Sequence, residues 1–463
     1  MSVNERFHGV LRKNPVNPRY FTDDTGRAIL LSGSHTWETI QELRLEGQGA
    51  ETNFDYDGFL AMLKENGHNF SRYWQWGYCE WAPWTDEKVI FEPLPYERTG
   101  PGLANDGKPK FDLDRFNEAY FKRLRERVEK AGELGIYVSV QFFDGWCQRY
   151  ANKWSDPWPS HPYNVSNNIN GVDADPDRTG KPLLFVLDFP QVLEYQKAFI
   201  RKTIDTLNDL DNVLWEIINE AAMPEHFAKI DKWHDYMVSY VKEYEASKPK
   251  QHMVGKTAAA SGVENEYLFV SDADWITVED NKTHDYRYNP PAADGRKIVI
   301  ADTDHSWGHG GTYIWAWKTF LSGMHPIFMD PWEPVPGRTI PGYPGTPELN
   351  RRDYAEWGRL RKNLGYILSY AERIDLNHCV PRKDVAYGHY CLAWEGEQYL
   401  VYIPEDCQLR LNMSYCEGEY DVEWFSPRTG EKVKCEPVKG GEKYTPFISP
   451  FGVDVVLLVT KRR

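Results

Sequence analysis

The chain has 463 residues and a formal net charge of −15 at neutral pH. This charge disfavours polyanionic partners such as nucleic acid or an anionic membrane surface, whereas neutral glycans remain compatible. No run of about 18 apolar residues is present, so no membrane span is predicted. Seven cysteines without a CxxC pair favour reduced thiols, and the N-terminus lacks a signal-peptide pattern. The sequence as written therefore predicts a cytoplasmic protein, or a secreted or periplasmic one if a signal peptide was trimmed.

Apolar, β-branched runs alternate with amphipathic helical patterns from residue 28 to about 375. Eight strands interleaved with helices predict a (β/α)8 TIM barrel for residues 1–376. The predicted strands are Ala28–Ser32, His68–Trp74, Ile136–Phe143, Asn212–Ile218, Met253–Thr257, Trp275–Val278, Lys297–Ala301 and Pro326–Met329. The predicted helices are Tyr56–Asn66, Arg115–Leu134, Pro190–Leu207, Phe227–Ala246, Tyr313–Leu321 and Arg351–Arg373.

Long aromatic inserts rich in Pro and Gly follow three of these strands. They are Gly77–Asp114, Asp144–Asp188 and Asp330–Asn350. Inserts of this length are usually functional loops, and all three follow strand C-termini, which form the active-site face of a barrel.

The pattern changes near Asn377 to short alternating strands. Tyr399–Ile403 and Tyr420–Phe425 are examples, and Ser426–Gly430 has turn composition. This pattern predicts a small β-sandwich over residues 377–463, which we expect to be an accessory domain.

The run Val213–Glu220 is buried in character and ends in Asn219-Glu220. A bare carboxylate is too costly to bury, so Glu220 must open onto a polar site. Glycosidic bonds are usually cleaved by two carboxyl groups, and Glu220 is the candidate acid/base. Asn219 is placed to hydrogen-bond a sugar 2-hydroxyl. The alternative is that Asn-Glu only caps the next helix.

The second carboxylate is expected after strand seven, where Asp302, Asp304 and His305 cluster. Side chains alternate along a strand, so the two aspartates are expected to point the same way. One would attack the sugar while the other orients a neighbour. The alternatives are an Asx turn and a metal site that includes His309. The spacing fits no established metal pattern, so no metal is predicted. Glu279, after strand six, is a rival second carboxylate.

Other polar and aromatic residues fall at strand ends or in the inserts. Arg72 ends strand two, where a cation keeps a nearby carboxylate ionised, unless it forms only a structural ion pair. Tryptophan faces stack on sugars, although long loops also need aromatic cores of their own. The predicted substrate contacts are Asn219, Arg72, His35, Trp37, Trp74, Trp146, His284, His305, Trp307 and Trp332.

These residues resemble the clan of (β/α)8 retaining glycoside hydrolases, which carry Asn-Glu after strand four and a second carboxylate after strand seven. Leu31–Trp37, Tyr399–Pro404 and Glu423–Gly430 resemble its apiosidase-like branch, which has a C-terminal collagen-binding-type β-domain. The resemblance implies a hydrolase of O-glycosidic bonds in a plant or microbial glycan, without metal or organic cofactor. The clan nucleophile is normally Glu, whereas this chain offers Asp302 and Asp304. An inverting hydrolase and an inactive carbohydrate-binding protein are the alternatives.

Overall fold

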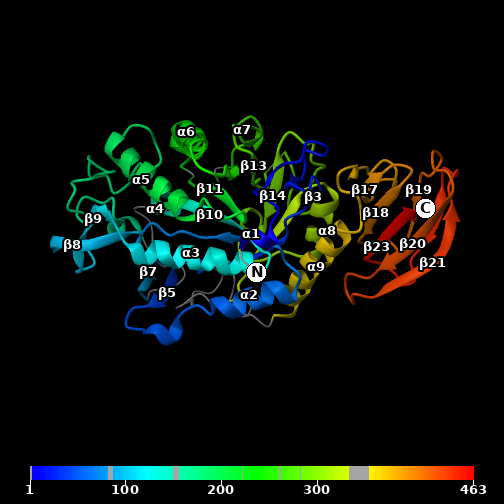
Figure 1. Ribbon diagram of the computed structural model, residues 1–463, viewed down its shortest axis with the longest axis horizontal. Coiled ribbons are helices and arrows are strands. Elements are labelled where there is room, and N and C mark those ends of the chain that lie inside the picture. The colour runs from blue at the N-terminus through cyan, green and yellow to red at the C-terminus, as the bar shows by residue number, and fades with distance from the viewer. Residues whose placement is uncertain are drawn as a thin grey trace.

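The computed structural model describes residues 3–81, 87–149, 156–221, 223–259, 262–281, 283–332 and 354–463. Within these ranges, eight parallel strands form a barrel surrounded by helices, and an antiparallel sheet lies beside it near the C-terminus (Figure 1). This arrangement confirms the predicted TIM barrel with a β-rich C-terminal part. No helix in the described ranges is long and apolar enough to cross a membrane. Residues 333–350 of the third predicted insert lie outside the described residues.

The barrel strands are joined in a single parallel order. β15 pairs with β4, and an isolated parallel bridge between Thr36 and Tyr73 links the β4 end to β6, which closes the barrel. The strands are β4 (Gly33–His35), β6 (Phe70–Tyr73), β10 (Tyr137–Asp144), β11 (Val213–Asn219), β12 (Val254–Lys256), β13 (Trp275–Ile276), β14 (Ile298–Asp302) and β15 (His325–Met329).

The prediction of Ala28–Ser32 as the first barrel strand is wrong. β3 (Ala28–Ile29) instead pairs with β2 (Phe21–Thr22), which also pairs with β1 (Arg12–Lys13), in a small antiparallel sheet. The side chain of Asn69 bonds the Leu30 carbonyl and the Ser32 amide at 2.8 and 2.9 Å. A side chain therefore satisfies backbone groups that a strand ladder would otherwise use, and the barrel strand starts at Gly33.

Most predicted helices are present with boundaries shifted by a few residues. α3 starts at Glu118 rather than at Arg115 because the Asn117 side chain caps the Ala119 amide. Arg115 instead belongs to a hairpin of β8 (Tyr96–Leu103) and β9 (Pro109–Phe116), far left in Figure 1. The helices are α1 (Val3–Arg6), α2 (Tyr56–Glu65), α3 (Glu118–Glu133), α4 (Trp146–Arg149), α5 (Pro190–Leu207), α6 (Phe227–Glu245), α7 (Glu266–Phe269), α8 (Tyr313–Leu321) and α9 (Ala355–Ala371). Two further strands, β5 (Glu42–Leu45) and β7 (Val89–Glu92), pair in antiparallel orientation.

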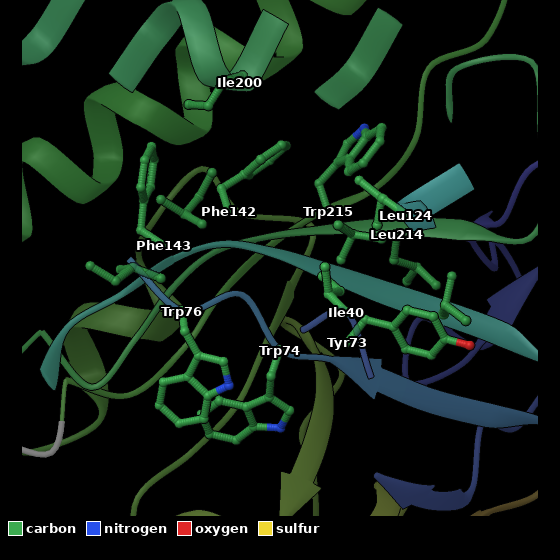
Figure 2. Packing of buried hydrophobic residues seen from close by; sticks show 14 of the residues in the cluster. Ile40, Tyr73, Trp74, Trp76, Leu124, Phe142, Phe143, Ile200, Leu214 and Trp215 are labelled. Atoms are coloured by element: carbon green, nitrogen blue, oxygen red, sulfur yellow. The ribbon is translucent and has the colours of Figure 1, made fainter. Parts of the chain in front are cut away.

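Side-chain alternation along the barrel strands separates an outer apolar layer from an inner polar one. Figure 2 shows Phe142 of β10 and Trp215 of β11 pointing to the same side, and their rings stack with centroids 5.2 Å apart. Because neighbours along a strand point to opposite faces, Glu216 faces the other way, into the barrel. The outward aromatic layer therefore fixes which side chains of β11 reach the interior.

Where the barrel closes, the backbones of β4 and β6 lie very close together at Gly33. A Cβ atom at this position would lie 2.1 Å from the carbonyl oxygen of Phe70 on the adjacent strand β6. The contact is with backbone, which cannot rotate away, so only glycine fits here.

The C-terminal part forms two antiparallel sheets that pack as a sandwich. One face of the larger sheet, with Leu400 and Phe425, shares an apolar core with Trp317 of α8 and Leu364 of α9. The opposite face shares a core with the smaller sheet. The larger sheet runs β16 (Val380–Pro381), β17 (Tyr390–Trp394), β18 (Gln398–Ile403), β23 (Val455–Lys461), β20 (Glu419–Phe425), β21 (Lys432–Lys439), and the smaller one pairs β19 (Gln408–Leu411) with β22 (Thr445–Ile448). The domain boundary at residue 377 stays a prediction.

A partly buried ion pair also links this sheet to the barrel. Glu423 of β20 accepts hydrogen bonds from the Tyr370 hydroxyl and the Arg373 guanidinium, at 2.8 and 2.7 Å. Burial alone would raise the pKa of Glu423, but these donors outweigh burial and lower it. The ionised carboxylate therefore stabilises the contact between the two parts.

We expect Gly33→Ala to destabilise the protein by about 3 kcal/mol or to prevent folding, since overpacking typically costs about 1–3 kcal/mol and backbone cannot yield here. Urea denaturation followed by tryptophan fluorescence measures the change. The matched control is Gly358→Ala in α9, where an added Cβ has no neighbour within 4 Å. This control is expected to be neutral or slightly stabilising. A Gly33→Ala protein as stable as the control would contradict the closure geometry.

We expect Glu423→Gln to flatten the acid limb of the stability curve. The folded-state pKa of Glu423 lies below its unfolded value, so its contribution is present above about pH 4.3 and is lost as pH falls through the folded pKa. Denaturation midpoints measured between about pH 3 and 7 should show a smaller loss on acidification for the variant than for wild type. Parallel curves would show that the pair does not couple to folding.

Candidate active site

A buried arginine joins the carboxyl ends of three barrel strands. Arg72 lies one residue before the end of β6, and its side chain is 1% exposed. Its Nε donates to Glu216 of β11 at 2.9 Å, and its Nη2 donates to Asn219 at 2.8 Å. Its Nη1 lies 3.3 Å from Oδ2 of Asp302 and 3.2 Å from Oδ2 of Asp304. Glu216 and the aspartates outweigh burial and raise the pKa of Arg72, so it is a permanent cation.

Glu216 is a residue that the sequence prediction missed. It lies in the middle of β11, is fully buried, and also accepts a bond from Ser139 at 3.4 Å. The available signal was a Glu inside an apolar strand, because a charge in that position requires a partner. Two further missed residues are Arg149 of α4 and Asp144 at the tip of β10. Burial raises the pKa of Asp144 well above its usual value, against hydrogen bonds that lower it.

Asp302 is held as a carboxylate by its neighbours. His35 Nδ1 accepts from the Trp74 indole at 3.0 Å, so the ring hydrogen lies on Nε2, which donates to Asp302 Oδ1 at 2.9 Å. Burial would raise the pKa of Asp302, but His35 and Arg72 overcome it and lower the pKa to about 2. Asp302 is thus an ionised, fully buried group.

Asp304 lies in the 3₁₀ turn Thr303–His305 that follows β14. The prediction that both aspartates point the same way agrees with their shared contact to Nη1 of Arg72. The Asx-turn alternative also holds, since Asp302 accepts from the Asp304 amide at 3.0 Å. Burial, then the charges of Glu220 and Asp302, raise the pKa of Asp304 to about 8.

Glu220 follows β11 in a strained backbone conformation. Its φ of 45° lies in the left-handed region, which costs a non-glycine residue about 1–2 kcal/mol. Its Oε2 accepts from the Trp146 indole at 2.8 Å and pairs with Arg149. Strained backbone conformations of this kind are common at functional sites, where contacts with the surrounding structure maintain them. Trp146 therefore reaches the predicted site through its N–H edge.

The side chains of Glu220, Asp304 and His305 lie close together. Each offers an oxygen or ring nitrogen, and these three atoms lie within 4.8 Å of one another. Glu220 Oε1 is 3.8 Å from Nδ1 of His305. Burial lowers the pKa of His305, although the charge of Glu220 opposes this. His309, which the sequence grouped with His305, instead packs on Trp37 with ring centroids 4.6 Å apart.

Several buried polar atoms around this point have no hydrogen-bond partner among the described residues. They are Asn219 Nδ2, both ring nitrogens of His305, and Oε2 of Glu279. Burial raises the pKa of Glu279. The charge of His305 opposes this shift, and the charge of Glu220 adds to it. The rival second carboxylate therefore borders the same site. Buried donors and acceptors of this kind are expected to meet ligand groups.

Most of the predicted sugar-stacking tryptophans are buried supports in this structure. Trp74 is fully buried and Trp37 is 3% exposed. Trp332 is also 3% exposed and packs against Phe54 and Phe59. These rings offer no open face to a sugar. Trp307 is partly exposed, with the Arg287 guanidinium 5.0 Å from its ring centre.

His284 lies apart from the cluster in an exposed loop beside Tyr286. Its backbone amide bonds the side chain of Asn281 at 2.9 Å. Its ring lies beside that of Tyr286, with centroids 6.0 Å apart. A substrate contact from His284 stays a prediction.

Comparisons with known proteins agree with this architecture. The family model "Domain of unknown function (DUF6298)" matches residues 80–289, and "Putative collagen-binding domain of a collagenase" matches residues 378–460. No curated protein matches the chain.

Two solved structures share the fold over nearly the whole length. A glycoside hydrolase family 5 protein from Bacteroides vulgatus ATCC 8482 has a TM-score of 0.60 at 13% identity, covering 100% of this chain and 95% of that one. A structure described as "Glycoside hydrolase" has the same score and identity, covering 98% and 97%. The fold is therefore that of barrel proteins classed as glycoside hydrolases. The apiosidase-like branch stays a prediction.

Glu216→Ala should destabilise the protein by about 3–5 kcal/mol, because removing one partner of a buried pair leaves the Arg72 charge uncompensated. Glu216→Gln keeps an acceptor for Arg72 and should cost less. Urea denaturation of the two variants and wild type measures both effects. A loss below about 1 kcal/mol for Glu216→Ala would mean that Arg72 does not depend on this carboxylate.

Proposed function

We propose that this protein is a retaining glycoside hydrolase that cleaves O-glycosidic bonds of a plant or microbial glycan. Glu220 would be the acid/base and Asp304 the nucleophile. The observation that carries the proposal is the pair of carboxyl groups at the barrel mouth, with oxygens within 4.8 Å of each other. Retaining enzymes place these groups about 5–5.5 Å apart, whereas inverting enzymes need about 6.5–9.5 Å to admit a water.

Two carboxyl groups this close repel each other when both are ionised. In the free site, burial and then the charges of Glu220 and Asp302 raise the pKa of Asp304 to about 8, which favours its protonated form at neutral pH. The proposed reaction uses the arrangement in which the proton lies on Glu220. Loss of the Glu220 charge then removes one cause of the raised pKa of Asp304, and the Arg72 contact favours its ionised form.

In the first step, Asp304 attacks the anomeric carbon while Glu220 gives its proton to the leaving oxygen. The bond between the sugar and the leaving group breaks as a bond to Asp304 forms. In the second step, Glu220 takes a proton from water, whose oxygen attacks the same carbon and releases Asp304. Asp302 would not react, because its ionised carboxylate is fully buried and held by His35.

The unpaired polar atoms support a polyhydroxylated substrate. Asn219 is fixed by Arg72 through its oxygen, which leaves its amide N–H groups for a sugar 2-hydroxyl. His305 and Glu279 add further donors and acceptors, and Trp307 adds a partly exposed ring. The description of the structural relatives as glycoside hydrolases supports the same substrate class.

Glu220→Gln should fold normally and lose about 10²–10⁴-fold in hydrolysis of alkyl glycosides, which is the usual contribution of general acid–base catalysis. The loss should be smaller for aryl glycosides whose leaving groups need no protonation. A panel of nitrophenyl and methyl glycosides, with circular dichroism to verify folding, measures this contrast. Near wild-type cleavage of an alkyl glycoside would rule out Glu220 as the acid.

Asp304→Ala should be almost inactive, whereas Asp302→Ala and Glu279→Ala should keep measurable turnover, because a covalent nucleophile cannot be replaced. Azide should partly restore Asp304→Ala and yield a glycosyl azide of inverted anomeric configuration, which NMR identifies. If Glu220→Ala gives the inverted azide instead, the two roles are exchanged. If Glu279→Ala is the inactive variant, the nucleophile follows strand six.

A further inference from the structure

We propose that Glu220, Asp304 and His305 form a binding site for a zinc-like divalent transition metal ion, which excludes the glycan when bound. The exclusion rests on the function proposed above, whereas the binding of the ion does not. The site would act as an inhibitory one at the mouth of the barrel.

The three side chains are already near chelating distance. Their ligand atoms lie within 4.8 Å of one another, and Glu220 Oε1 is 3.8 Å from His305 Nδ1. Ligands about 2.0–2.1 Å from a tetrahedral zinc ion are about 3.3 Å apart. Small side-chain rotations therefore bring the three atoms onto one ion without movement of the barrel strands.

His305 points independently to a ligand. Its side chain is 0% exposed, and neither ring nitrogen has a hydrogen-bond partner among the described residues. A buried, unsatisfied polar atom costs about 1–3 kcal/mol. A metal bond to Nδ1 satisfies one of these atoms, and Nδ1 is the atom that faces Glu220.

Each of the two neighbouring guanidinium groups contacts one oxygen of a ligand carboxylate. Arg149 binds Oε2 of Glu220, so Oε1 stays directed to His305. Arg72 binds Oδ2 of Asp304. One oxygen of each carboxylate is thus held in place by a cation, and hydrogen-bonded partners of this kind orient the ligands of metal sites.

The local charge also favours a cation. The buried carboxyl groups of Glu216, Glu220, Asp302 and Asp304 outnumber the two guanidinium groups, of Arg72 and Arg149, that pair with them. Buried charges need compensation. A divalent cation would supply it in full.

The donor set selects the type of metal. One imidazole with two carboxylates suits Zn²⁺, Co²⁺ or Ni²⁺, whereas Mg²⁺ and Ca²⁺ prefer oxygen ligands alone. Because the ion uses both carboxylates that the proposed reaction requires, it competes with the glycan. Zn²⁺ should therefore raise KM for a cleaved glycoside without changing kcat.

The binding test uses the full chain after treatment with EDTA and its removal. Co²⁺ should give visible d–d absorption bands saturating at one ion per chain, and Zn²⁺ should abolish the bands while a tenfold excess of Mg²⁺ should not. Zn²⁺ should also raise the thermal midpoint. Absence of the bands, or their loss with Mg²⁺, would overturn the site.

His305→Ala should weaken Co²⁺ binding at least tenfold, and Glu220→Gln provides a second ligand variant of nearly unchanged shape. The matched control is His309→Ala, four residues away, which should bind Co²⁺ like wild type. Circular dichroism verifies that each protein is folded. Equal affinity in wild type and His305→Ala, or an equal loss in His309→Ala, would show that the ligand set is wrong.

The two proposals fail separately. Co²⁺ bands that depend on His305, in a protein that cleaves no glycoside, would support the metal site and count against the hydrolase. Hydrolysis without Co²⁺ bands would support the hydrolase and count against the metal site. Inhibition by Zn²⁺ that lowers kcat and leaves KM unchanged would contradict competition with the glycan.

Discussion

The arrangement of the site depends on the ion pairs and hydrogen bonds of the Arg72 guanidinium. This guanidinium is buried in the barrel, and burial of a cation is tolerated only with partners of opposite charge. Its partners come from β11 and β14, which lie on other sides of the barrel. One side chain therefore fixes the relative positions of Glu216, Asn219, Asp302 and Asp304. The polar interior and the candidate catalytic groups are a single network.

The network contains more negative than positive charge, and this excess links the two proposals. A proton on Asp304 reduces the repulsion, and the proposed hydrolase needs one of the two carboxyl groups protonated and the other ionised. A divalent cation reduces the repulsion in another way, but it occupies both groups. Protonation and metal binding are thus alternative means of neutralising the same buried cluster of carboxylates.

Much of the barrel was predictable because its signals are local. Pro190–Leu207 and Tyr313–Leu321 have the observed helix boundaries, since Pro begins the first and Thr312 caps the second. Apolar runs that end in polar residues also located Glu220 and the two aspartates. The first strand was misplaced because Asn69, 37 residues from Ser32, satisfies the backbone there.

The remaining features depend on contacts between distant residues. Glu216 was not recognised, since its partner Arg72 is 144 residues away in sequence. The sequence predicts tryptophans both for sugar stacking and for the cores of the long loops, but composition does not distinguish an open ring from a covered one. Trp74 is covered by its neighbours, whereas Trp307 keeps an exposed edge. Burial of this kind follows from packing and is not encoded by spacing.

The C-terminal sheet contacts the helix that follows the loop after β14. Among the described residues, the site groups all come from the barrel. Asp454 of the sheet region is 1% exposed and accepts from Tyr313, the first residue of α8, and from Tyr402 and Arg428. Tyr313 lies nine residues after Asp304. The sheet thus anchors the first residue of α8, which is the helix that follows the loop carrying the proposed nucleophile.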